Sequence, residues 1–183
     1  MILRCPEQPA TGMIGAMTLI SRTDRTVPVT VQARTPVAPG SAFDIVVPID
    51  LSRVFHGWGP FPGVRGAKNQ TGAWDHVGAS RNPDLSDGST ATERLTEYTS
   101  GHSFGYEITG FTNMLGKIAE GVRGEWTFTP DQQGTVIRWT YEFKPRPGCH
   151  PVIAFGLAPV WRRYMLDAIR ATVSAVEQDA HPD

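Results

Sequence analysis

The sequence predicts an α+β domain in which a curved antiparallel sheet of about six or seven strands wraps around one long C-terminal helix. The helix is indicated by the stretch after Pro159, which has no further glycine or proline up to Glu177. Its apolar residues recur with a period of about 3.6, as one buried helix face requires: Trp161, Met165, Ala168, Ile169, Thr172, Val173 and Val176. Because such a helix must pack on something and the preceding chain is almost all strand, we expect it to lie on that sheet.

Composition excludes several functional classes. The chain has 183 residues, of which 40% are hydrophobic, enough for one domain with a sizeable core. Its formal net charge is -1 and it has no run of Lys or Arg, so we expect no nucleic-acid partner. No apolar run is long enough to cross a bilayer, so we expect no stable membrane insertion.

The cysteines and the N-terminal segment bear on location and domain limits. Cys5 and Cys149 lie far apart, which favours free thiols in a reducing compartment. The first residues lack the basic and apolar pattern of a signal peptide, so we expect a cytoplasmic protein. Residues 1–26 have no sustained period and are predicted as an arm, either disordered or an added first strand. Residues 27–183 are predicted as a single domain.

The domain is expected to begin with one strand and two short helices. Residues 27–35 alternate between apolar and polar side chains, which predicts a half-buried strand. Ser41 is expected to cap a short helix that stops at Pro48. Asp50 is expected to cap a second helix over residues 51–55.

A loop and a run of strands follow. Residues 56–64 are rich in glycine and proline and contain Trp58 and Phe61, which predicts a lid or a loop packed over the domain. Residues 113–119 are predicted as a second loop. The remaining pattern is strand and tight turn, typical of an antiparallel meander, with strands expected over residues 73–81, 90–98, 102–111, 120–129 and 135–145.

Alternation assigns an aromatic inner face to the later strands. One interpretation is that these rings simply fill the core. The other is that they enclose a ligand site, because binding pockets are lined mostly by apolar and aromatic side chains. The candidate ligand-binding residues are Trp58, Phe61, Trp74, Phe104, Tyr106, Trp126, Phe128, Trp139, Tyr141, Trp161 and Met165.

A few polar residues on the predicted inner surface are candidates for catalysis. These are His102, Tyr106 and Arg81, although Arg81 has an equally good outward-facing placement and a lone histidine on an apolar face is more often structural. Glu93 shares a strand face with Leu95. If both point inward, Glu93 needs a partner such as Arg81, because an unpaired buried carboxylate is costly.

Three other motifs match in part, but the surrounding sequence does not predict the structure that each of them needs. Residues 101–105 fit G-x-S-x-G, but this nucleophile motif needs a sharp turn into a helix and residues 106–109 continue as a strand. The glycines of residues 57–63 do not form a phosphate loop, because Pro60 and Pro62 remove backbone donors. The histidines and cysteines have no metal-ligand spacing, so we expect neither a metal nor another cofactor.

Several short segments occur in a specific order: Ala42-Phe43, Asp50-Leu51, Val54-Phe55, Gly63-Val64, Gly72-Ala73-Trp74, Arg81, Leu85, Asp87-Gly88, Glu93-Arg94-Leu95, residues 124–128, Gly134-Thr135 and Trp139-Thr140-Tyr141. This order resembles the helix-grip layout of the START/Bet v 1-like superfamily, and more specifically its polyketide cyclase/dehydrase-like branch, often called SRPBCC. The resemblance covers residues 27–178. It implies a hydrophobic cavity between sheet and helix, but no universal catalytic motif.

Three functions remain open. The first is binding of a small hydrophobic or aromatic molecule, lipid- or polyketide-like, between sheet and helix. The second is a polyketide aromatase/cyclase-type enzyme, which needs a cavity that folds the substrate and a proton donor near an enolate oxygen. His102, Tyr106 and Arg81 are its candidate residues. The third is a protein-interaction or homodimeric module without a ligand, which the polar outer strand faces do not favour.

Overall fold

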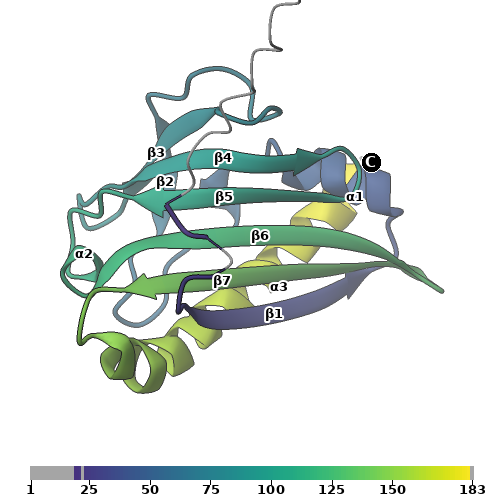
Figure 1. The fold of residues 1–183 in the computed structure, drawn as a ribbon. Coiled ribbons are helices and arrows are strands. Elements are labelled where there is room, and N and C mark those ends of the chain that lie inside the picture. Colours follow the sequence, from purple (N-terminus) through teal and green to yellow (C-terminus); the bar gives the residue numbers. More distant parts are fainter. Residues whose placement is uncertain (1–18, 22, 182–183) are drawn as a thin grey trace, which may run out of the picture.

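The sheet and the C-terminal helix form the two layers of the molecule. The computed structural model describes residues 19–21 and 23–181. Figure 1 shows the long helix α3 (Ala158–Ala180) crossing one face of the sheet. The strands are antiparallel in the order β1-β7-β6-β5-β4-β3-β2, with bounds β1 (Val27–Thr35), β2 (Val64–Lys68), β3 (Ser80–Leu85), β4 (Thr92–Thr99), β5 (Ser103–Thr109), β6 (Ala119–Asp131) and β7 (Gly134–Pro145). The predicted α+β architecture is confirmed.

The other helices are short. They are α1 (Pro39–Val46), the 3-10 helix η1 (Leu51–Arg53), α2 (Leu115–Ile118) and the π-helix η2 (Val152–Leu157), which leads directly into α3. The turn α2 lies where the sequence predicted only a loop, because a single turn is too short to show a period.

The buried face of α3 follows the predicted stripe. Met165 and Ile169 are almost fully buried, and Tyr164 extends the buried face toward the start of the helix. Thr172 is also buried, and its hydroxyl donates to the carbonyl of Ala168 at 2.9 Å. The stripe therefore packs against the sheet without leaving this hydroxyl unsatisfied.

The N-terminal caps of α1 and η1 can be compared with the two predicted caps. The helix α1 begins at Pro39 rather than after Ser41, because proline suits the first turn, where an N–H has no intrahelical partner. Asp50 caps η1 as predicted, since its carboxylate accepts a hydrogen bond from the N–H of Ser52 at 2.9 Å. This helix ends at Arg53, earlier than predicted.

One predicted strand is wrong. Most of residues 73–79 form bends and turns. The flanking glycines Gly72 and Gly78 have φ angles of 142° and 99°, which interrupt regular extended backbone. The strands in this region are instead β3, which starts at Ser80, and β2, which the sequence analysis missed.

The N-terminal segment lies against the outer face of the sheet, away from α3, where Figure 1 shows it in dark purple. The backbone N–H groups of Leu19 and Ile20 donate to the Glu107 carboxylate at 2.9 and 2.8 Å. Lys144 donates to the carbonyl of Leu19 at 3.0 Å and pairs with Asp24 at 3.2 Å. Residues 1–18 of the predicted arm lie outside the described residues.

Candidate functional site

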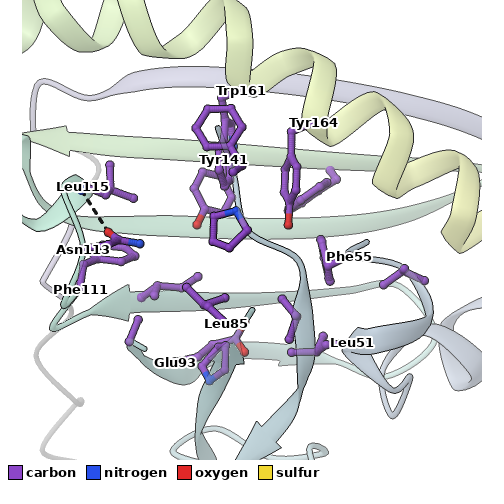
Figure 2. A pocket seen from close by; sticks show the side chains of 18 of the residues that line it. Leu51, Phe55, Leu85, Glu93, Phe111, Asn113, Leu115, Tyr141, Trp161 and Tyr164 are labelled. Atoms are coloured by element: carbon purple, nitrogen blue, oxygen red, sulfur yellow. Dashed lines mark hydrogen bonds between the residues drawn. The ribbon is translucent and has the colours of Figure 1, made fainter. Parts of the chain in front are cut away.

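An apolar cavity of about 680 Å³ lies between the sheet and α3. It is lined by the η1 region, the loop over residues 60–64, the inner faces of β3 to β7, the α2 region, and the start of α3. Figure 2 shows side chains from these separate segments converging on one space. Side chains of the sheet and of α3 do not fill the space between the two layers here.

The structure brings most of the predicted ligand-binding residues to this cavity. Those that line it are Phe61, Phe104, Tyr106, Trp126, Trp139, Tyr141 and Trp161. Trp126 and Trp139 stack with ring centroids 4.9 Å apart and form a rigid aromatic part of the wall.

Four predicted residues lie elsewhere. Phe128 and Met165 are buried in the core, where Phe128 packs edge-on against Phe43 at 5.5 Å. Trp74 is buried behind the wall, and Trp58 lines a smaller hollow formed by residues 56–63 with Ser86 and Asp87. Alternation gave the correct face for Phe128, but not its distance from the cavity.

The catalytic candidate His102 is also misplaced in the sequence analysis. Strand β5 begins at Ser103, and His102 lies in the preceding turn, where its N–H donates to the carbonyl of Thr99 at 3.0 Å. The side chain is exposed and does not line the cavity. The turn between β4 and β5 covers residues 100–102, one residue later than predicted, so the strand pattern does not extend to His102.

A buried ion pair forms part of the cavity wall. Arg81 Nε donates to Glu93 Oε2 at 2.6 Å, and both side chains are more than nine-tenths buried. The guanidinium of Arg81 also lies 4.0 Å from the ring centroid of Trp74, a cation–π contact. The condition stated for an inward-facing Glu93 is therefore met by Arg81, although the sequence analysis did not include Glu93 among its site residues.

Tyr106 reaches across the sheet. Its hydroxyl accepts a hydrogen bond from Trp139 Nε1 at 3.0 Å, although Tyr106 is on β5 and Trp139 on β7. The ring passes over Gly124 on the intervening β6, which pairs with Tyr106 on one side and Tyr141 on the other. Burial raises the pKa of the Tyr106 hydroxyl, so it stays protonated.

Two further tyrosine hydroxyls point into the cavity. Tyr141 on β7 and Tyr164 on α3 both pack against Trp161, with ring centroids 5.0 and 4.8 Å from the indole (Figure 2). Neither hydroxyl hydrogen bonds to any of the described residues. Burial raises the pKa of both groups. Tyr164 was missed by the sequence analysis, although its position three residues after Trp161 places both on one helix face.

The cavity reaches the surface beside α2 and η2. Met114 and Val152 line it and are 68% and 54% exposed, and Phe155 of η2 is 83% exposed. On another side, Phe61 closes over Trp161 and Tyr164 with centroid distances of 4.8 and 5.7 Å. The mouth of the cavity is therefore apolar on the side of α2 and η2, and the loop of Phe61 covers another part of the cavity.

Within residues 19–21 and 23–181, no three His, Cys, Asp or Glu side chains cluster closely enough to hold a metal ion. In the same part of the chain, no helix is both long and apolar enough to cross a membrane.

A curved antiparallel sheet closed by a long helix over an apolar cavity defines the helix-grip class. The sequence matches the family described as polyketide cyclase / dehydrase and lipid transport over residues 26–180, so the chain belongs to this family. The resemblance to the SRPBCC superfamily is thereby confirmed. No curated protein matches the chain in sequence.

Solved structures share the fold at low sequence identity. XoxI from Bacillus cereus is 14% identical, with a TM-score of 0.62 over 85% of this chain and 99% of its own. Ara h 8.0201 is 16% identical, with a TM-score of 0.59 over 85% of this chain and 97% of its own. A point mutant of norcoclaurine synthase from Thalictrum flavum, in complex with a transition-state analogue, is 11% identical. Its TM-score is 0.63 over 88% of this chain and 100% of its own. These similarities concern the fold alone.

Proposed function

We propose that the protein binds a small hydrophobic or aromatic molecule, lipid- or polyketide-like, in the cavity between the sheet and α3. The observation that carries this proposal is the cavity itself, about 680 Å³ in volume and lined mainly by apolar and aromatic side chains. That volume lies within the range of roughly 300–1,000 Å³ typical of small-molecule sites. Affinity would come mainly from burial, at about 0.8 kcal/mol per buried CH₂ group.

The first test is to purify the protein from its own host, record its mass under native conditions, and identify any compound that organic extraction releases. A stoichiometric apolar compound is the expected result. Binding is then measured with a neutral fluorescent probe, N-phenylnaphthylamine, on wild type and on Ile108→Trp. Ile108 lines the cavity and is half-buried, so the larger ring should occupy ligand space.

The matched control is Val77→Trp, which adds the same ring at a residue that is 50% exposed and does not line the cavity. We expect about tenfold weaker probe binding in Ile108→Trp and no change in Val77→Trp. Equal probe affinity in both variants would show that the probe binds outside the cavity and would count against the proposal.

A cyclase-type activity is the second candidate, and the tyrosine hydroxyls in the cavity favour it. The reaction is an intramolecular aldol condensation of a poly-keto chain followed by loss of water. A phenol O–H near the enolate oxygen would supply the donor this step needs. If Tyr106 has that role, Tyr106→Phe should abolish turnover of a poly-keto substrate, whereas exposed His102 should tolerate His102→Ala. Unchanged turnover in Tyr106→Phe would remove Tyr106 from the mechanism. Homodimer formation and cytoplasmic location stay predictions.

A further inference from the structure

Several hydrogen-bond donors of the cavity wall have no acceptor within the described residues. The hydroxyls of Tyr141 and Tyr164 lie among apolar lining residues and contact no acceptor among the described residues. Trp161 Nε1, on the indole against which both tyrosines pack, is buried and also has no acceptor in that part of the chain. A bound molecule that supplied acceptors would satisfy these donors, and a pure hydrocarbon would leave them unpaired.

Each carboxylate or amide side chain of the described cavity wall already accepts at least one hydrogen bond. The amide oxygen of Asn113 accepts from the N–H of Leu115 at 3.1 Å. Glu93 is the buried carboxylate of the wall and is paired with Arg81. The hydroxyl of Tyr106 accepts from Trp139. Asp87 also lines the cavity, but it is exposed and accepts hydrogen bonds from Ser89. The two free tyrosine hydroxyls stay protonated because burial disfavours the phenolate, so they act as donors at physiological pH.

The charges of the wall disfavour an anionic ligand. The ionisable residues with full charges at neutral pH that line the cavity are Arg81, Asp87 and Glu93, so the described lining carries one positive and two negative charges. The positive charge is neutralised by Glu93. A buried carboxylate on a ligand would therefore meet no unpaired cation in the described wall, at a high desolvation cost.

We propose that Tyr141 and Tyr164, which both pack against Trp161, form a subsite that donates hydrogen bonds to the carbonyl oxygens of a neutral, largely apolar ligand. This inference rests on the proposed binding function and narrows its ligand class to ketones and quinones. Hydrocarbons should bind more weakly than ketones of the same shape, and ligands that bury an ionised carboxylate are disfavoured. The aromatic wall supplies most of the affinity, and the hydroxyl pair selects among apolar ligands of the same shape.

The test compares anthraquinone with anthracene, which share a ring skeleton and differ in the carbonyl oxygens. Each displaces N-phenylnaphthylamine from wild type and from Tyr141→Phe, Tyr164→Phe and the double variant. For each protein we take the ratio of the anthraquinone affinity to the anthracene affinity. The wild-type ratio is then divided by the ratio for the double variant. In this quotient the difference in hydrophobicity between the two ligands cancels. We expect this quotient to be on the order of tenfold or more, since two hydrogen bonds are lost. The affinity ratio of each single variant should lie between the ratios of wild type and the double variant.

Controls separate this inference from the proposed function. Tyr98→Phe removes a hydroxyl from a residue that packs on Phe43 and does not line the cavity, so it should keep the wild-type ratio. Anthracene should bind the double variant at least as well as wild type, which also shows that the variant is folded. A quotient near one, with both ligands still bound, would overturn the subsite and leave the binding function standing. Failure of wild type to bind the probe and both ligands would overturn both. Tighter binding of anthracene carboxylate than of anthraquinone would refute the neutral ligand class.

Discussion

Gly124 is the residue that allows Tyr106 and Trp139 to meet. A Cβ at position 124 would collide with the ring of Tyr106, whose hydroxyl depends on the present path to reach Trp139. The colliding atoms belong to a buried aromatic ring, which has little room to shift.

We therefore predict that Gly124→Ala destabilises the protein by about 1–3 kcal/mol, the usual cost of overpacking. The same change at Gly40 in α1 is the control, because nothing lies within 4 Å of the added Cβ there. Gly40→Ala should be neutral or slightly stabilising. Urea denaturation checks both variants. Equal stability of Gly124→Ala and wild type would mean that the Tyr106 ring has another low-energy position.

The Arg81–Glu93 pair is costly to break from one side only. Arg81→Met or Glu93→Leu alone leaves one buried charge without its partner, and we expect each to cost about 3–5 kcal/mol. The double variant Arg81→Met/Glu93→Leu should recover most of that loss, because no charge remains buried. Free energies of unfolding from urea titrations measure the coupling. Additive losses in the double variant would contradict a direct interaction between the two side chains.

At the scale of elements, the N-terminal segment is attached to the sheet through the Glu107 carboxylate and through Lys144. Glu107 is 8% exposed although it lies on the outer strand face, because residues 19 and 20 cover it. The residue pattern predicts only that this outer face is polar. It does not predict the cover, because backbone N–H donors belong to every residue except proline.

Replacing Glu107 should release the segment without unfolding the domain. In Glu107→Ala we expect faster cleavage by trypsin after Arg25, which is exposed, and faster hydrogen exchange at the amides of Leu19 and Ile20. Glu125→Ala is the control, since Glu125 on the same face contacts Arg123 and not the segment. Unchanged cleavage and exchange in Glu107→Ala would show that the segment is held by other contacts.

For the whole molecule, the buried tyrosines of the cavity should make the free energy of unfolding depend on pH in the alkaline range. Burial raises the pKa of Tyr106, Tyr141 and Tyr164 above their value in the unfolded chain, which is about 10. Their contribution to stability is present below pH 10. As the pH rises further, the unfolded chain loses these protons before the folded protein does, so the free energy of unfolding falls.

The slope should reach about 1.4 kcal/mol per pH unit for each tyrosine that stays protonated in the fold. Urea denaturation between pH 8 and pH 11 measures it. The double variant Tyr141→Phe/Tyr164→Phe should show a shallower decline, and Tyr98→Phe should change it less, because Tyr98 is less buried. Identical slopes in wild type and the double variant would contradict the burial of these hydroxyls.

Much of the fold follows from local patterns. The period of the last helix, the limits of residues 27–35 and the long hairpin of β6 and β7 are predictable because hydrophobic period and turn chemistry depend only on nearby residues. The error at residues 73–81 has the opposite cause. That segment alternates well, but Gly72 and Gly78 adopt φ angles that break the extended backbone, and Trp74 enters the core from an irregular path.

The sequence by itself determined that aromatic strand faces would meet a long helix, and the family to which that order of elements belongs. Only the tertiary structure decided which of those side chains border empty space. Phe128 and Tyr141 both lie on inner faces, yet Phe128 is in the core and Tyr141 on the cavity. The difference depends on which element covers each side chain, because Phe43 of α1 packs on Phe128 whereas Tyr141 borders the cavity beside Trp161. These contacts join residues remote in the chain, which no local pattern records.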